Sequence, residues 1–117
     1  MSNKGRDFLL FIDDILEAIR KLEMYTGNLS FEDFRGNDMA IDAVIRNFEV
    51  IGEAAKHVPK KIKEKYPDVE WQEATGFRNV LIHDYFGIDV EAVWDTLHKN
   101  IPVFKKHIEH VFAAERI

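Results

Sequence analysis

Apolar residues recur at steps of three and four along most of this 117-residue chain. Such steps place side chains on one face of an α-helix, whereas a half-buried strand alternates at every second position. The spacing predicts long helices over about residues 7–25, 38–57, 71–87 and from residue 89 to near the end. Amphipathic helices with short connections predict an all-α, antiparallel bundle of four to five helices, folded as one domain over residues 1–117.

Glycine, proline and capping residues separate these helices. Gly27 ends the first helix, and a short turn segment over residues 30–37 leads to Asn37 or Asp38 as the next N-cap. Residues 59–67 begin and end with proline, which leaves room for about two turns of helix. The connections are therefore too short for anything but neighbouring, antiparallel packing.

Two residues interrupt the predicted helices. Gly52 lies in mid-helix, where it costs about 1 kcal/mol relative to alanine, so we expect a backbone or a bulky ring such as Trp71 or Trp94 to approach it closely. In the last helix, which begins near Asp89, the apolar stripe keeps its phase through Pro102. The sequence therefore predicts a long C-terminal helix with a proline kink.

Composition limits the classes of protein. Cysteine is absent, which excludes disulfides and thiolate zinc sites and fits a reducing cytoplasm. No apolar run approaches the roughly 20 residues of a membrane span, and acidic residues break the one near the start, so we expect a cytoplasmic protein that binds no membrane. The net charge is −5, yet residues 56–65 carry +4 and leave −9 for the rest. This basic segment is either a guide for a phosphate chain or, as we favour, a solvated lysine face.

The segment from Trp71 to Gly87 sets a few polar residues among apolar ones. These polar residues are Arg78, Asn79, His83 and Tyr85. A buried arginine or histidine costs several kcal/mol (about 3–5) unless it is paired. In one straight helix Arg78 and Tyr85 would share a face, whereas His83 would lie about 140° away from Arg78. Either the helix loosens near His83, or these groups meet partners from another element or another chain.

The sequence RNVLIHDYFGID resembles the signature of the HepT-like toxins, a branch of the HEPN superfamily of small helical RNases. The matching positions are Arg78, the polar Asn79, His83 and the branch-specific Tyr85, and the flanking NFEVIGEAAK and VEAVWDTLHKNIP extend the resemblance over about residues 7–112. The resemblance implies a HEPN-like bundle and a homodimer with a composite cleft. It also implies a type VII-like toxin–antitoxin pair, in which a minimal nucleotidyltransferase antitoxin adenylylates Tyr85.

The residues themselves fit RNA cleavage. His83 can take a proton from a ribose 2′-hydroxyl or give one to the departing 5′-oxygen, and Arg78 can hold the scissile phosphate. We therefore expect Arg78 and His83 to be catalytic, Asn79 and Tyr85 to bind the RNA substrate, and no metal or cofactor to take part. One such histidine per chain is little for both acid and base roles, which favours a homodimer that supplies two.

Other interpretations remain open. Arg78 could pair with Glu53 or Glu73, with His83 capping the helix end and Tyr85 an ordinary tyrosine. Glu53 is otherwise predicted to join a local ion-pair row with Arg46 and Glu49.

Among the remaining candidates, a solvated pair is favoured over a metal site for His107 and His110, one turn apart. The rival functions are a non-catalytic HEPN module that binds nucleotide or protein, and a partner subunit that docks a nucleotidyltransferase.

Overall fold

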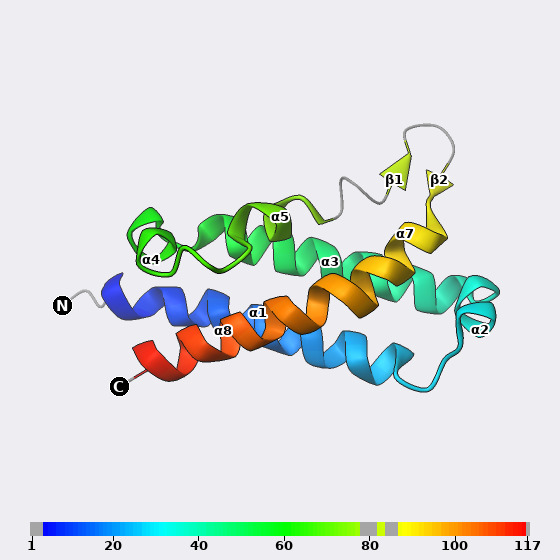
Figure 1. Ribbon diagram of the computed structural model, residues 1–117, viewed down its shortest axis with the longest axis horizontal. Coiled ribbons are helices and arrows are strands. Elements are labelled where there is room, and N and C mark those ends of the chain that lie inside the picture. Colours follow the sequence, from blue (N-terminus) through cyan, green and yellow to red (C-terminus); the bar gives the residue numbers. More distant parts are fainter. Residues whose placement is uncertain (1–3, 78–81, 84–86, 117) are drawn as a thin grey trace.

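The computed structural model describes residues 4–77, 82–83 and 87–116. Three long helices run lengthwise through a molecule of 49 × 30 × 26 Å: α1 (Lys4–Thr26), α3 (Asp38–His57) and α8 (Ile101–Glu115). Both α3 and α8 run antiparallel to α1 (Figure 1). This confirms the predicted all-α bundle, while the extent of the domain stays a prediction.

Shorter elements complete the described fold. They are α2 (Phe31–Arg35), α4 (Lys60–Lys65), α5 (Trp71–Thr75), β1 (Ile82–His83), β2 (Gly87–Ile88), α7 (Val90–Asp95) and a π-helical turn (Thr96–Asn100). Both chain ends and α4 lie at one end of the bundle, and α2, α7 and the strands lie at the other (Figure 1). The predicted turn segment thus contains one helical turn, α2, which Ser30 caps through its Oγ.

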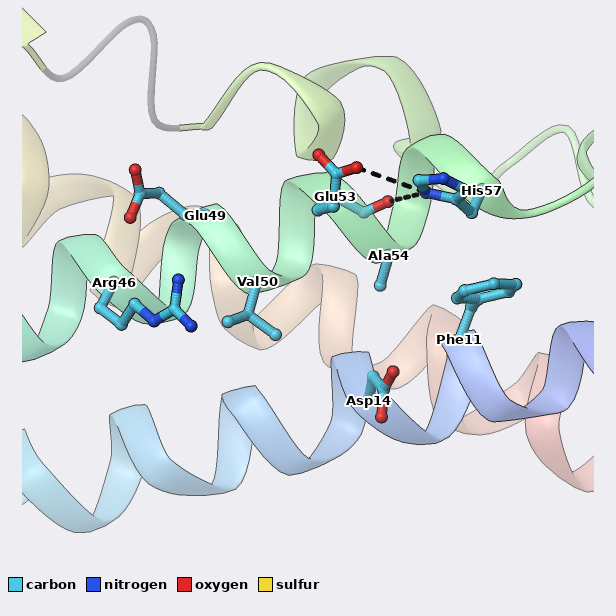
Figure 2. A pocket seen from close by; sticks show the side chains of 8 residues that line it. All are labelled: Phe11, Asp14, Arg46, Glu49, Val50, Glu53, Ala54 and His57. Atoms are coloured by element: carbon cyan, nitrogen blue, oxygen red, sulfur yellow. Dashed lines mark hydrogen bonds and ion pairs between the residues drawn. The ribbon is translucent and has the colours of Figure 1, made fainter.

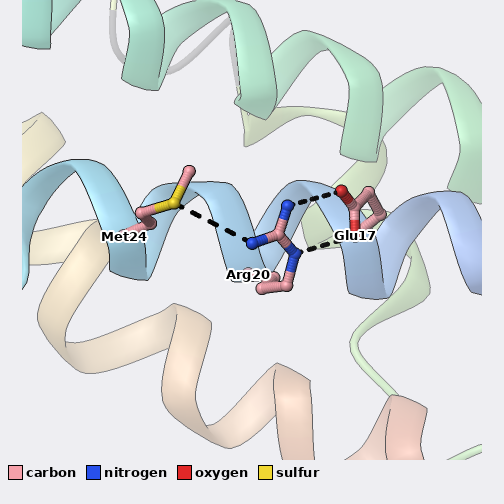
Figure 3. A network of polar contacts seen from close by, with 3 residues as sticks. All are labelled: Glu17, Arg20 and Met24. Atoms are coloured by element: carbon pink, nitrogen blue, oxygen red, sulfur yellow. Dashed lines mark hydrogen bonds and ion pairs between the residues drawn. The ribbon is translucent and has the colours of Figure 1, made fainter.

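The predicted apolar stripes of α1 and α3 form the core. The residues at those steps are buried almost without exception: Phe8, Ile12, Ile15, Ile19, Leu22, Ile41, Val44, Phe48, Ile51 and Ala55. Asn37 caps α3 by accepting a hydrogen bond from the backbone of Ala40, at 3.0 Å. The opposite face of α1 carries solvated polar contacts, in which Arg20 donates to Glu17 and to the Met24 sulfur (Figure 3).

Gly52 is where α5 crosses α3. A Cβ at this position would lie 3.0 Å from the Thr75 carbonyl oxygen and 3.2 Å from that of Ala74. The predicted close approach is therefore confirmed, and its nearest partner is backbone rather than an indole ring. A glycine allows two backbones to approach this closely, which fixes α5 on α3.

The C-terminal helix continues through Pro102, as predicted. α7, the π-helical turn and α8 join without a break, and the Ile101 N–H bonds the Thr96 carbonyl across five residues. Proline lacks an N–H and its ring crowds the preceding turn, so a widened turn next to it relieves that crowding. The helix adapts to proline by a local change of winding.

The prediction of a helix over residues 71–87 is wrong. α5 ends at Thr75, and Ile82–His83 pairs antiparallel with Gly87–Ile88. Gly87 has a φ of +84°, so it opens a strand in the left-handed region and does not end a helix. Valine, isoleucine and aromatic side chains fill this stretch, and they fit strands better than helices. The 140° separation of Arg78 and His83 assumed one straight helix and no longer applies.

Candidate functional site

The motif residues fall on the part of the chain that the structure describes least. Arg78, Asn79 and Tyr85 lie outside the described residues. For His83 the structure describes the backbone, which lies in β1 opposite Gly87. The described residues on either side therefore define how the fold holds this motif.

On the N-terminal side the chain is fixed in the core. Trp71 is buried, and its indole N–H donates to the Tyr66 carbonyl at 3.0 Å. Phe77, 4% exposed, lies between Phe48 of α3 and Phe104 of α8, with ring centroids 5.8 Å from each. Each such aromatic pair contributes about 0.5–1.5 kcal/mol beyond its buried area. The chain consequently enters Arg78 from a rigid, buried residue.

On the C-terminal side a strand pair and a helix cap hold the chain. Ile82 pairs with Ile88, and the next residue, Asp89, caps α7 by accepting from the Ala92 backbone at 3.0 Å. Val93, on the first turns of α7, is fully buried. The backbone of His83 is thus tied through β2 to a capped helix that packs into the core.

A groove lies beside Phe77, on the N-terminal side of the motif. Two adjoining hollows of about 230 and 160 Å³ share Glu73, Phe77 and Asn100, and they run between α5 and the π-helical turn. Gln72 and Thr96 supply further hydrogen-bonding groups to its lining. Since Phe77 directly precedes Arg78 in the chain, this groove is the hollow that the described residues place next to the motif.

A larger hollow of about 410 Å³ lies between α1 and α3 (Figure 2). His57 donates to the Glu53 carbonyl at 2.8 Å, lies 3.6 Å from its carboxylate, and stacks on Phe11. Figure 2 shows Arg46 reaching toward α1, with Glu49 on the other side of α3. The pair described for Glu53 is therefore with His57, a residue outside the predicted row, and the row itself stays a prediction.

The charges around this hollow disfavour phosphate. It is lined by the three carboxylates of Asp14, Glu49 and Glu53 and by one guanidinium, that of Arg46. A phosphate in the hollow would meet more negative than positive charge. An RNA-binding role for this chain therefore has to be sought elsewhere on the surface.

The two histidines of α8 differ from the predicted solvated pair. His107 is half-buried, and its Nδ1 lies 3.0 Å from a Glu70 carboxylate oxygen. His110 is exposed and meets the Tyr66 ring edge-on. Within the described ranges no group of three histidines or carboxylates could hold a metal ion.

A further contact, which we call the Glu115 tether, joins the end of α8 to Lys65 and Tyr66, and nothing in the sequence predicted it. The Tyr66 hydroxyl donates to Glu115, and the Lys65 ammonium lies 2.7 Å from the same carboxylate. The Lys65 contact, followed by the Tyr66 hydroxyl, holds the pKa of Glu115 below its ordinary value, and the Glu115 contact raises the pKa of Tyr66. Residues about 50 positions apart make this contact, which periodicity cannot predict.

Comparison with known proteins identifies the family. Residues 15–111 match the model of the family described as ribonuclease HepT-like, a range that includes the whole segment from Arg78 to Tyr85. The chain belongs to the ribonuclease HepT-like family. The predicted resemblance is therefore confirmed.

Several known proteins are similar to this chain over most of their own length. A Methanocaldococcus jannaschii protein named "Putative RNase" is 44% identical over 91% of this chain and 88% of its own length. The "Probable ribonuclease HepT" of Thermococcus cleftensis is 41% identical over 93% and 96%, and a "Putative RNase" of Caldanaerobacter subterraneus is 36% identical over 91% and 95%. No solved structure matches the chain.

None of the helices in the described part of the chain is both long and apolar enough to cross a membrane.

Proposed function

We propose that this protein is a metal-independent endoribonuclease and the toxin of a type VII-like toxin–antitoxin pair. The family and the names of its members indicate ribonuclease activity. The observation that carries the proposal is a family match that spans the sequence Arg78-x4-His83-x-Tyr85. The Arg/His site, the pairing with an antitoxin and the homodimer are the finer parts of the proposal.

Arg78 and His83 carry out the cleavage. His83 accepts the proton of a ribose 2′-hydroxyl, the 2′-oxygen attacks phosphorus, and the bond to the 5′-oxygen breaks. Arg78 binds the phosphate and stabilises the charge that builds on its oxygens, while Asn79 and Tyr85 contact the RNA. The departing 5′-oxygen takes a proton from the His83 of a second copy, and the products carry a 2′,3′-cyclic phosphate and a 5′-hydroxyl.

A homodimer supplies the second arginine and histidine. A twofold axis beside the motif places two copies of it across one cleft, so that the acid and the base come from different chains. In such a cleft the buried Phe77, directly before Arg78, and the strand pair of β1 with β2, which includes His83, fix the backbone that carries the motif. Light scattering that gives a monomer at micromolar concentration would contradict the proposed cleft.

Tyr85 is the site of silencing. A minimal nucleotidyltransferase antitoxin transfers AMP from ATP to its hydroxyl, which loses its proton as the bond between the α- and β-phosphates breaks and pyrophosphate leaves. The added phosphate then occupies the place of the RNA phosphate with negative charge and bulk. Mass spectrometry after coexpression with such an enzyme should find AMP on Tyr85. A protein that has lost RNA cleavage under those conditions while Tyr85 carries no AMP would contradict this step.

Substitution of the two catalytic residues tests the activity. Arg78→Ala and His83→Ala should each lower the rate of RNA cleavage by about 100- to 10,000-fold, the usual contribution of a positioned acid–base or charge-stabilising group. Wild-type cleavage should persist in EDTA and leave a 2′,3′-cyclic phosphate end. His110→Ala is the matched control, because His110 is an exposed histidine outside the motif.

Two outcomes would redirect the proposal. Cleavage that the Arg78 and His83 variants leave unchanged would place the activity at another site. Purified wild-type dimer that binds a nucleotidyltransferase and cleaves no RNA would favour the non-catalytic partner subunit.

A further inference from the structure

Four lysines, three exposed and Lys63 half-buried, form a basic surface around α4 that the proposed mechanism does not use. This lysine face consists of Lys56, Lys60, Lys61 and Lys63, of which Lys60 is 89% exposed at its side chain. α4 itself has no buried residue. Two half-buried residues, Ile62 and Tyr66, pack against the core and attach α4 to it. The helix therefore positions charges without contributing a core face of its own.

The lysine face is largely left without counter-charges. Two other lysines meet carboxylates from distant parts of the chain: Lys65 lies 2.7 Å from Glu115, and Lys105 lies 2.9 Å from Glu23. On the lysine face, by contrast, the one described pair is Lys60 with Glu64, at 4.0 Å. The exposed Lys56 and Lys61 consequently face solvent without a described carboxylate partner.

The fold gives no structural reason for this concentration of charge. Lys60 and Lys63 are three residues apart in α4, and like charges at this spacing destabilise a helix. The segment over residues 56–65 carries +4 on a chain whose net charge is −5. An acidic body repels a polyanion everywhere except at such an island, so the island also determines where the polyanion binds.

The position of α4 connects the lysine face with the motif. α4, α5 and the strand pair of β1 with β2 follow one another along one long edge of the bundle (Figure 1). A nucleic acid chain that lies along this edge passes from the lysine face over α5 to the motif.

We propose that the lysine face binds the phosphate backbone of the RNA substrate at a distance from the bond that is cut. This inference rests on the proposed ribonuclease function and adds a second contact with its substrate. The contact is electrostatic and independent of base sequence, because ammonium groups displace the counterions of phosphates. A lipid surface fits less well, since Ile62 is the one large aliphatic residue of α4 and it packs against the core.

The test compares two substrates. The quadruple variant Lys56→Gln, Lys60→Gln, Lys61→Gln, Lys63→Gln should cleave a dinucleotide, which reaches only the motif, at the wild-type rate. On an RNA long enough to reach the lysine face, its KM should rise at least tenfold with little change in kcat. The control variant Arg20→Gln, Lys21→Gln, Lys105→Gln, Lys106→Gln changes the net charge equally on α1 and α8, and it should resemble the wild type.

Binding gives a readout that does not depend on cleavage. In a His83→Ala background, which leaves the RNA intact, the logarithm of the affinity should fall less steeply with the logarithm of salt concentration once the four lysines are replaced. At roughly 0.7 per phosphate contact of a single strand, the slope should decrease by about 2 to 3. Circular dichroism melts that match the wild type exclude unfolding as the cause.

The outcomes separate the two proposals. A wild-type protein that binds long RNA through the lysine face and cleaves neither substrate overturns the ribonuclease proposal and leaves the binding surface. The proposal for the lysine face is overturned if the quadruple variant cleaves both substrates with the wild-type KM. It is also overturned if the KM for the long RNA rises equally in the control variant. So does a quadruple variant that keeps its RNA affinity and loses binding to phosphatidylserine vesicles instead.

Discussion

The pair α1–α3 and the segment from α5 to β2 respond differently to the same kind of sequence pattern. In α1 and α3 apolar residues occupy one face and charged residues the other, and the predicted stripe is buried almost residue for residue. Between Trp71 and Gly87 polar and apolar residues alternate without one clear polar face, and the described residues of this segment form a short helix, α5, and the strands β1 and β2. An apolar pattern predicts a helix reliably when the opposite face is polar, because burial of the one face and solvation of the other then favour the same helix.

The largest expected effect on stability comes from a substitution at Phe48, where α3 contacts the residue that precedes the motif. Phe48 is fully buried in α3 and contacts Phe77, the residue before the motif. Phe48→Ala should lower the free energy of unfolding by about 3–5 kcal/mol, because it removes a large side chain and leaves a cavity. Urea denaturation measures the change.

Met39 offers a control on the same helix. Its side chain is 83% exposed, so Met39→Ala should change the free energy of unfolding by no more than about 0.5 kcal/mol. Equal losses in the two variants would mean that the burial of Phe48 does not support the junction between α3 and the motif.

How far sequence alone predicts this molecule depends on whether a feature is local. The helices α1 and α3, the Asn37 cap and the close approach at Gly52 follow from spacing and from the chemistry of single residues. The strands β1 and β2 do not, because in a short apolar run the helical and extended patterns look alike, and strand pairing was the deciding interaction.

The candidate site divides in the same way. The identities of Arg78, Asn79, His83 and Tyr85 came from the sequence, and their roles stay predictions. The groove beside α5 and the Glu115 tether could not be predicted, because both join residues that are close only after folding. Local patterns thus indicate which residues to watch, and tertiary contacts determine how they are held.

The next largest effect tests the contact between α3 and α5. In Gly52→Ala the new methyl group would press on the backbone oxygens of Thr75 and Ala74. Overpacking costs about 1–3 kcal/mol, against a gain of about 1 kcal/mol in helix propensity, so we expect net destabilisation. RNA cleavage should fall as well, because α5 leads directly to the motif.

Gly36→Ala is the matched control for this glycine. The nearest atom to a Cβ there is 3.7 Å away, an ordinary contact, and the residue has a negative φ. Its stability and activity should stay near those of the wild type. Activity lost equally in both glycine variants would argue against a specific role for the approach of α5 to α3.

A smaller effect on stability is expected from removing either of two helix caps, and comparing the two variants separates stability from the rate of RNA cleavage. Asn37→Ala removes the cap of α3 and Asp89→Ala that of α7, and each should cost about 1 kcal/mol in the free energy of unfolding. Asp89 directly follows β2, so its loss should also reduce the rate of RNA cleavage, whereas Asn37→Ala should leave that rate unchanged. Thermal melts and cleavage rates measured on the same samples would show the difference, and equal rates in the two variants would contradict it.

The smallest effect is the pH dependence of the tether between α8 and the α4 end of the bundle. The pKa of Glu115 is lowered in the folded protein, so its stabilisation is present above the ordinary carboxyl value and is lost as the pH falls through the folded value. The pKa of Tyr66 is raised, so its contribution is present below the ordinary value of 10.0 and is lost as the pH rises through the folded value. Glu115→Gln should therefore destabilise the protein most between these limits, and it should make the melting temperature depend less on pH at both ends of the range.

Glu17→Gln, which removes the local pair with Arg20 on α1, is the control. That pair joins one helix to itself, so its loss should change the melting temperature less than the loss of a contact between elements. A larger effect from Glu17 than from Glu115 would show that this tether contributes little to holding α8 against α4.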